Sequence, residues 1–291
     1  MNVLFKHMPE IADDICLIRS ATTDPINHDP AVTFLQTGSP LSGRPSMGSW
    51  LSYGLGSANE NLPAFIVLLS GGGQPVPSRY WHNGFLPSRH QGVKFQSSGD
   101  PVLFLSNPKG MSDLNRKQTI DRINAFNQLK HEQSGDSEIE ARIDAFQLAY
   151  RMQSSAPEAL NISSEPEYLK NLYGLNQAKS KHFAAQCMMA RRLVERGTRF
   201  VQIYSGGMAN QRSWDGHSDI KGNHSGFAAE TDQPVAGLLA DLEQRGLLDE
   251  TLVVWAGEFG RLPVAQKGGK PGRDHNPHCF TAWLAGGGGK G

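Results

Sequence analysis

The chain has 291 residues, of which 38% are hydrophobic, and it is rich in glycine (32) and proline (17). Its 28 Lys and Arg residues balance its 28 Asp and Glu residues, so the overall charge does not predict a nucleic acid or an anionic membrane as a partner. The sequence has no run near the roughly eighteen apolar residues that a membrane span requires. Three scattered cysteines predict neither a disulfide framework nor a thiolate metal site, and we expect them to be small buried hydrophobes.

The first predicted elements are a short helix end followed by a strand over 11–20. Asp29 predicts the cap of a helix whose first position is Pro30, and Gly38 predicts its end. His28 would then precede a helix N-terminus, where backbone amides favour an anion. It is therefore either a contact for a phosphate-like group or a metal, or a loop histidine with a backbone partner.

The middle of the chain predicts a large insertion over about 74–180. Before it come a short helix over 47–54 and a strand over 62–69 that ends in a glycine-rich turn. Residues 74–108 lack periodicity, and loops of that length are uncommon unless they are functional. Apolar residues at three- and four-residue intervals then predict helices throughout 111–196.

Three further apolar runs, over 198–204, 251–255 and 280–285, predict strands. A helix is predicted over 232–245 between the first two of them. Helices that alternate with apolar runs are typical of a mainly parallel sheet covered on both faces. We therefore expect a single α/β domain.

Polar side chains of the kinds that bind metals follow the predicted strands. Asp215 and His217 follow the strand at 198–204, and Glu258 and Arg261 follow the strand at 251–255, at the strand ends where open α/β sheets bind ligands. The next loop brings three more candidates within five residues, namely Asp274, His275 and His278.

Carboxylates and imidazoles without thiolates suit a divalent ion such as Zn, Mn, Fe, Mg or Ca. Two such ions about 4 Å apart would clamp the attacking and leaving oxygens of an ester displacement, and Arg261 could bind a planar oxyanion bidentately. The other interpretation is a structural ion-pair corner. GxSxG, Walker A and strand-linked GxGxxG motifs are all missing from the sequence.

Five segments of the chain together resemble a known family; they are TLVVWAGEFGR, GRDHNPH, WDGH, DLEQRGLLDETLVVW and ARRLVERGTRFVQIYSGG. The family is the bacterial sulfatase-like family of unknown function 1501, placed in the alkaline phosphatase superfamily, and the similarity runs along nearly the whole chain. The resemblance implies a three-layer α/β/α sandwich with two metals at the C-terminal ends of the strands.

The resemblance also assigns roles to residues. Asp215 and His217 resemble the Asp/His pair of one superfamily metal site, and His275 resembles a later lone histidine, with Asp274 and His278 as its neighbours. At the other metal site, Glu258 stands in the acidic place and Phe259 stands where a histidine is usual.

The nucleophile position is also changed. His28 lies nine residues before Thr37, which is the position of the sulfatase nucleophile. We expect His28 and Arg261 to be catalytic and the metal ligands to be Asp215, His217, Glu258, Asp274, His275 and His278.

The resulting functional hypothesis is a metal-dependent hydrolase of phosphate or sulfate esters. Its substrate would be a small anionic ester or a sulfated glycan. The alternatives are a non-catalytic descendant that binds such an anion, and an inactive gene fragment. The resemblance implies truncation at both ends, and relatives often carry an export signal that this sequence does not show.

Overall fold

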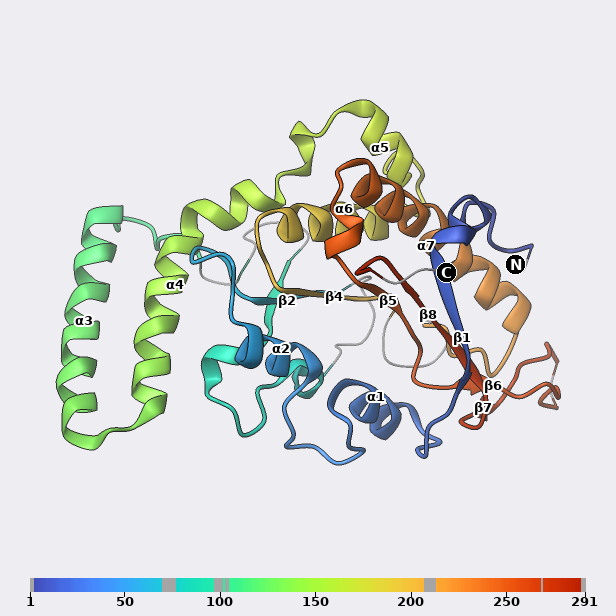
Figure 1. The fold of residues 1–291 in the computed structure, drawn as a ribbon, viewed down its shortest axis with the longest axis horizontal. Helices are drawn as coiled ribbons and strands as arrows, with labels where there is room; N and C mark the ends of the chain where they lie inside the picture. Colours follow the sequence, from blue (N-terminus) through green and yellow to red (C-terminus); the bar gives the residue numbers. More distant parts are fainter. Residues whose placement is uncertain are drawn as a thin grey trace.

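The computed structural model describes residues 3–69, 77–96, 102, 105–206, 213–267 and 269–288, and Figure 1 shows its fold. Its strands are β1 (Ile15–Ala21), β2 (Phe65–Leu69), β3 (Val93–Phe95), β4 (Phe200–Tyr204), β5 (Val253–Trp255), β6 (Gly260–Arg261), β7 (His275–Asn276) and β8 (Phe280–Ala285). Its α-helices are α1 (His28–Thr37), α2 (Met47–Leu55), α3 (Asp113–Ser134), α4 (Ser137–Leu160), α5 (Glu167–Tyr173), α6 (Lys181–Glu195) and α7 (Ile220–Gln244). Short 3-10 helices are η1 (Met8–Asp14), η2 (Ser78–Trp81), η3 (Ser88–His90), η4 (Ile162–Ser164) and η5 (Leu248–Glu250).

The described strands form three small sheets, so the predicted three-layer α/β/α sandwich with a mainly parallel, alkaline phosphatase-like sheet is wrong. Only the sheet of order β3-β2-β4 is parallel. The sheet of order β1-β8-β5 is antiparallel throughout, and β6 and β7 form a two-stranded antiparallel ribbon. The reason is the connection between β5 and β8. It contains the β6–β7 ribbon and no described helix, and a parallel pair normally requires a long, usually helical, crossover.

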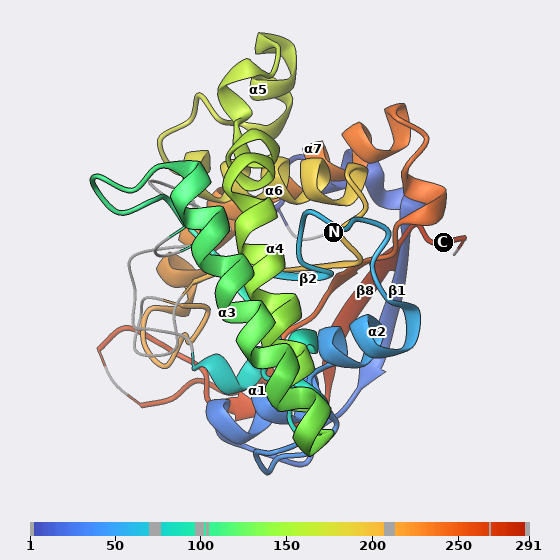
Figure 2. The same cartoon turned by 90° about the vertical axis from the view of Figure 1, so that its left-hand side faces the viewer.

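The two three-stranded sheets also differ in how they are covered. In β2 four of the five residues are buried, as in a strand covered on both faces, and α6 and α2 lie on opposite sides of this sheet (Figures 1 and 2). In β1 five consecutive residues are exposed, including Leu17 and Ile18, and Val254 of β5 is also exposed. The expected cover on both faces therefore holds for the parallel sheet only.

Helix α6 joins the two main parts of the hydrophobic core. Its Cys187 and Met188 pack in the cluster that contains α7, β1 and β8 residues, while Met189 and Leu193 pack in the cluster that contains β2 and β3 residues. Among the cysteines, only Cys187 is the buried hydrophobe that we predicted, because Cys16 and Cys279 are exposed.

Helices α1 and α7 begin at residues other than the predicted ones. Helix α1 begins at His28 with Asn27 as its N-cap, so Asp29 lies inside the first turn and is not the cap. Gly38 does end the helix, with φ of 70° in the left-handed region. Helix α7 begins at Ile220 and not near residue 232, because Asp219 caps it by accepting a hydrogen bond from the Gly222 amide.

The loop-rich stretch also contains structure that the sequence pattern did not predict. Strand β3 lies in it and pairs in parallel with β2. Helices α3 and α4 follow it within the region predicted to be helical, and they form the antiparallel hairpin at one end of the molecule that Figure 2 shows face on. Residues 74–76, 97–101 and 103–104 of the stretch, and the predicted glycine-rich turn at 70–73 before it, lie outside the described residues. Every described helix is too short or too polar to span a bilayer.

The N-terminal segment is fastened to α7 by one buried carboxylate. Asp232, 5% exposed, accepts hydrogen bonds from the backbone amides of Lys6, His7 and Met8 at 2.6, 2.9 and 2.9 Å. We expect Asp232→Ala to lower the free energy of unfolding by about 2–3 kcal/mol, because hydrogen bonds to a charged group are strong and their donors would lose a buried acceptor. Urea unfolding measures the loss, and hydrogen exchange should show the amides of residues 6–8 exposed first. Unchanged exchange at these amides would contradict the prediction.

Candidate metal centre

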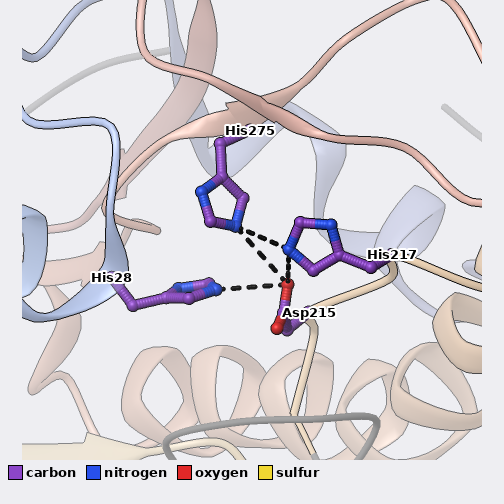
Figure 3. Close-up of side chains that lie close together, drawn as sticks. All are labelled: His28, Asp215, His217 and His275. Carbon is purple, nitrogen blue, oxygen red and sulfur yellow. Dashed lines mark hydrogen bonds and ion pairs between the residues drawn. The ribbon is translucent and has the colours of Figure 1, made fainter. Parts of the chain in front are cut away.

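Four side chains from three separate parts of the chain converge on one point (Figure 3). They are His28 at the start of α1, Asp215 and His217 in the loop between β4 and α7, and His275 at the start of β7. One nitrogen or oxygen of each lies within 4.8 Å of those of the others.

The spacing of these atoms suits a single ion. The Asp215 Oδ1 atom lies 3.1 Å from His28 Nε2, 3.0 Å from His217 Nε2 and 3.6 Å from His275 Nε2. The Nε2 atoms of His217 and His275 are 2.9 Å apart. Two ligand atoms that each bind one Zn²⁺ at about 2.0–2.1 Å lie about 3.0–3.4 Å from each other. The cluster therefore needs little rearrangement to hold an ion.

The outward-facing nitrogen of each histidine is already hydrogen-bonded to an oxygen. The Nδ1 of His28 donates to Glu258 Oε1 at 2.6 Å, and the Nδ1 of His217 donates to Gln266 Oε1 at 3.1 Å. Carboxylate and amide oxygens accept hydrogen bonds, so they fix the proton on Nδ1 and leave Nε2 with a lone pair.

His275 follows the same rule through the backbone. Its Nδ1 donates to the carbonyl oxygen of Ile26 at 2.5 Å. The facing Nε2 atoms of His217 and His275 then present two lone pairs to each other at 2.9 Å, which is unfavourable unless a cation or a proton lies between them. The Nε2 of His28 is buried and faces the Asp215 Oδ1 atom at 3.1 Å. These ring nitrogens and the neighbouring carboxylate are the ligand types that a divalent transition metal prefers, so the four residues could hold one.

One arginine pairs with the buried carboxylate of the centre. Asp215 is 5% exposed and accepts a hydrogen bond at 2.5 Å from Arg261 Nη2. Burial raises the pKa of Asp215, but the hydrogen bond from Arg261 and the nearby His28 outweigh it, so the pKa lies below its usual range. Asp215 is therefore a carboxylate at neutral pH, the form that binds metal.

The histidines differ in their electrostatic surroundings. Burial lowers the pKa of His28, but the hydrogen bond and charge of Glu258, together with Asp215, outweigh burial and raise the pKa above 6.5. Burial lowers the pKa of His275. Phe259 packs against both rings, with centroids 4.9 Å from His28 and 4.3 Å from His275, and so fills the space beside the ligand atoms.

The loop that carries Asp215 and His217 is held by the segment before β7. The Arg273 amide donates to the Gly216 carbonyl at 2.9 Å, and the Ile220 amide donates to the Pro271 carbonyl at 3.1 Å. Gly272 is required in this contact, because a Cβ there would lie 1.8 Å from the His217 carbonyl oxygen. The glycine-rich loop thus lets two chain segments approach closely enough for His217 and His275 to meet.

The structure places the predicted site residues in two groups. Asp215, His217 and His275, expected as ligands, lie in the cluster, together with His28, expected as a catalytic residue. Glu258 and Arg261 lie one step outward, bound to His28 and Asp215.

Besides Glu258, two more of the expected ligands, Asp274 and His278, lie outside the cluster. Asp274 is 53% exposed, and its Oδ1 is 3.9 Å from His217 Nδ1, on the outer side of that ring. His278 is exposed and its backbone amide donates to Asn276 Oδ1. The ligand and catalytic roles of all these residues stay predictions.

The partners of His217 and His275 could not be predicted from the sequence. Gln266 lies in a loop of Lys and Gly residues without a distinguishing pattern, and the Ile26 carbonyl is a backbone group that leaves no trace in residue types.

Comparison with known proteins gives one match. The family model described as "Protein of unknown function (DUF1501)" matches residues 1–291. No curated protein and no solved structure matches the chain.

Proposed function

Because the chain belongs to the DUF1501 family, whose description names no activity, the function has to be argued from the site, and we propose that the protein is a metal-dependent hydrolase of small phosphate or sulfate esters. The observation that carries the proposal is the convergence of three imidazole nitrogens and one carboxylate oxygen on a common centre. A catalytic metal site and an anion-binding arginine in one place are what ester hydrolysis at a charged centre requires.

The charges near the centre favour an anionic ligand once a divalent ion is bound. Asp215 and Glu258 supply two negative charges and Arg261 one positive charge, all within hydrogen-bond contact of the cluster or part of it. A divalent ion changes the sum of these charges from −1 to +1. Arg261 has five N–H donors, and the described bonds to Asp215 and to the Arg273 carbonyl use two of them. Further donors are therefore available to orient an anion.

Each partner in the site has a definite task under this proposal. His28, Asp215, His217 and His275 would hold the ion, which supplies Lewis acidity that draws charge from an ester oxygen. Arg261 would orient both Asp215 and the anionic group, and Phe259 keeps water from one side of the His28 and His275 rings. The choice of phosphate and sulfate esters is supported by the resemblance of Asp215, His217 and His275 to superfamily ligand positions, and not by the fold.

The four-ligand geometry also favours a second candidate, a structural metal site. An ion bound tetrahedrally by four protein side chains has no open position, and here it would join α1, the loop before α7 and β7, which are far apart in sequence. The anion-binding alternative without turnover belongs to the same class of non-catalytic function.

Metal analysis and turnover assays on the purified 291-residue chain separate these functions. We expect about one divalent ion per chain, hydrolysis of an aryl phosphate or aryl sulfate, and loss of hydrolysis on chelation. His182→Ala, which changes an exposed histidine on α6, is the matched control and should keep both properties. Bound metal without hydrolysis of either ester would support the structural site, and a chain that binds no metal would refute both.

A further inference from the structure

We propose that Glu258 is a positioning residue that fixes His28 for the metal centre and is not itself a ligand; this inference rests on the proposed metal-dependent function. Glu258 was predicted to be a ligand because it stands in an acidic place after a strand. Its position relative to the two nitrogens of His28 argues for the different role.

Glu258 lies on the side of the His28 ring that faces away from the centre. Its Oε1 accepts a hydrogen bond from Nδ1 at 2.6 Å, whereas Nε2 faces Asp215 Oδ1 at 3.1 Å. The two ring nitrogens point in different directions. A carboxylate bound to Nδ1 therefore cannot share an ion with Nε2 without breaking its own hydrogen bond. Glu258 accordingly does not belong to the group of atoms that lie within 4.8 Å of one another.

The hydrogen bond from His28 to Glu258 differs in kind from those of the other two histidines. The acceptor for His217 is the neutral amide of Gln266, and the acceptor for His275 is the neutral carbonyl of Ile26. A bond to a carboxylate is charge-assisted and stronger than one to a neutral oxygen. Such a partner sets the tautomer and ring orientation of a ligating histidine and raises the basicity of its free nitrogen. His28 is thus the histidine whose donor strength the protein increases most.

The surroundings of Glu258 also argue against a purely structural ion pair. Both side chains are 23% exposed, so water partly screens their ion pair and reduces what it adds to stability. The ring of His28 is additionally held by Phe259 at 4.9 Å. The contribution that Phe259 cannot supply is an acceptor oxygen, which fixes the proton on Nδ1 and so directs Nε2 toward the centre.

The test is the dissociation constant for Zn²⁺ and the visible spectrum with Co²⁺, in variants of the whole chain. We expect Glu258→Ala to weaken Zn²⁺ binding about 10–100-fold, the usual effect of removing an outer partner. Glu258→Gln keeps an acceptor oxygen and should recover part of the loss. Gln266→Ala, which removes a neutral partner, should have a smaller effect than Glu258→Ala. All three should keep the wild-type Co²⁺ spectrum, because the ligand set is unchanged.

Asp215→Asn supplies the comparison for a true ligand and should change both the affinity and the Co²⁺ spectrum. If Glu258→Gln behaves like Asp215→Asn, Glu258 is a ligand and the inference is wrong. If Glu258→Ala lowers the melting temperature of the metal-free protein but leaves the Zn²⁺ affinity unchanged, its role is structural and the inference is again wrong. If the wild-type protein binds Zn²⁺ and the variants show these graded losses, but the wild-type protein hydrolyses neither ester, only the proposed function is refuted. Wild-type protein that binds neither ion would refute both.

Discussion

Replacing Arg191 with methionine is expected to lower the free energy of unfolding by about 3 kcal/mol or more. Arg191 is 1% exposed and forms ion pairs with Glu165 at 2.8 Å, Glu195 at 2.9 Å and Asp241 at 2.9 Å. Removing one member of a buried charge network typically costs about 3–5 kcal/mol, because the partners remain buried without compensation. In the variant Arg192 still contacts Glu165 and Arg245 still contacts Asp241. We therefore expect a loss of stability toward the lower end of this range.

Urea unfolding followed by circular dichroism measures this loss. Lys117→Met is the matched control, because it breaks an exposed ion pair with Asp121 on α3 and should leave the midpoint unchanged. Equal midpoints for Arg191→Met and Lys117→Met would contradict the prediction.

The same network shows what a helix pattern in the sequence predicts and what it leaves out. Positive charges near the C-terminal end of a helix are ordinarily favourable partners of its dipole. Arg191 is instead the centre of a buried cluster in which Tyr173 also donates to Asp241 at 2.9 Å. Periodicity identified the helix, but the identity of a buried polar partner depends on residues 26 and 50 positions away along the chain.

Strands were predicted more reliably than the pairing between them. The strand at 280–285 has the predicted bounds, and β2 and β4 end at the predicted residues. Apolar runs reveal a strand because burial selects the residue types, whereas pairing depends on the path of the connection. The absence of a helical pattern between 255 and 280 was the available signal for an antiparallel β5–β8 pair, and the expectation of a parallel sheet overrode it.

For the candidate centre too, the sequence predicted the residue types better than the contacts between them. Asp215, His217 and His275 could be proposed from sequence because ligand-type residues gather in loops after strands. His28 was placed near the site, and the structure adds that its Nε2 lies in the cluster and its Nδ1 on Glu258. A sequence gives the residue types of a site but not which ring nitrogen faces inward, because that is decided by oxygens such as the Ile26 carbonyl.

Removing one imidazole from the cluster is expected to abolish metal binding at concentrations that saturate the wild type. His217→Ala and His275→Ala each delete one of four candidate ligands. The dissociation constant should rise by more than the roughly 100-fold upper effect of an outer partner. His278→Ala is the matched control, since His278 lies three residues from His275 but outside the cluster and is exposed.

Thermal and chemical unfolding with and without Zn²⁺ measure this difference in affinity as a difference in the free energy of unfolding. An ion present at 100 times its dissociation constant stabilises the folded chain by about 2.7 kcal/mol. A 100-fold weaker site at the same concentration provides only about 0.4 kcal/mol. Wild type and His278→Ala should therefore gain stability on addition of Zn²⁺, whereas His217→Ala and His275→Ala should gain almost none. If His278→Ala loses the gain and His275→Ala keeps it, the metal binds elsewhere in this loop and the assignment of the centre is wrong.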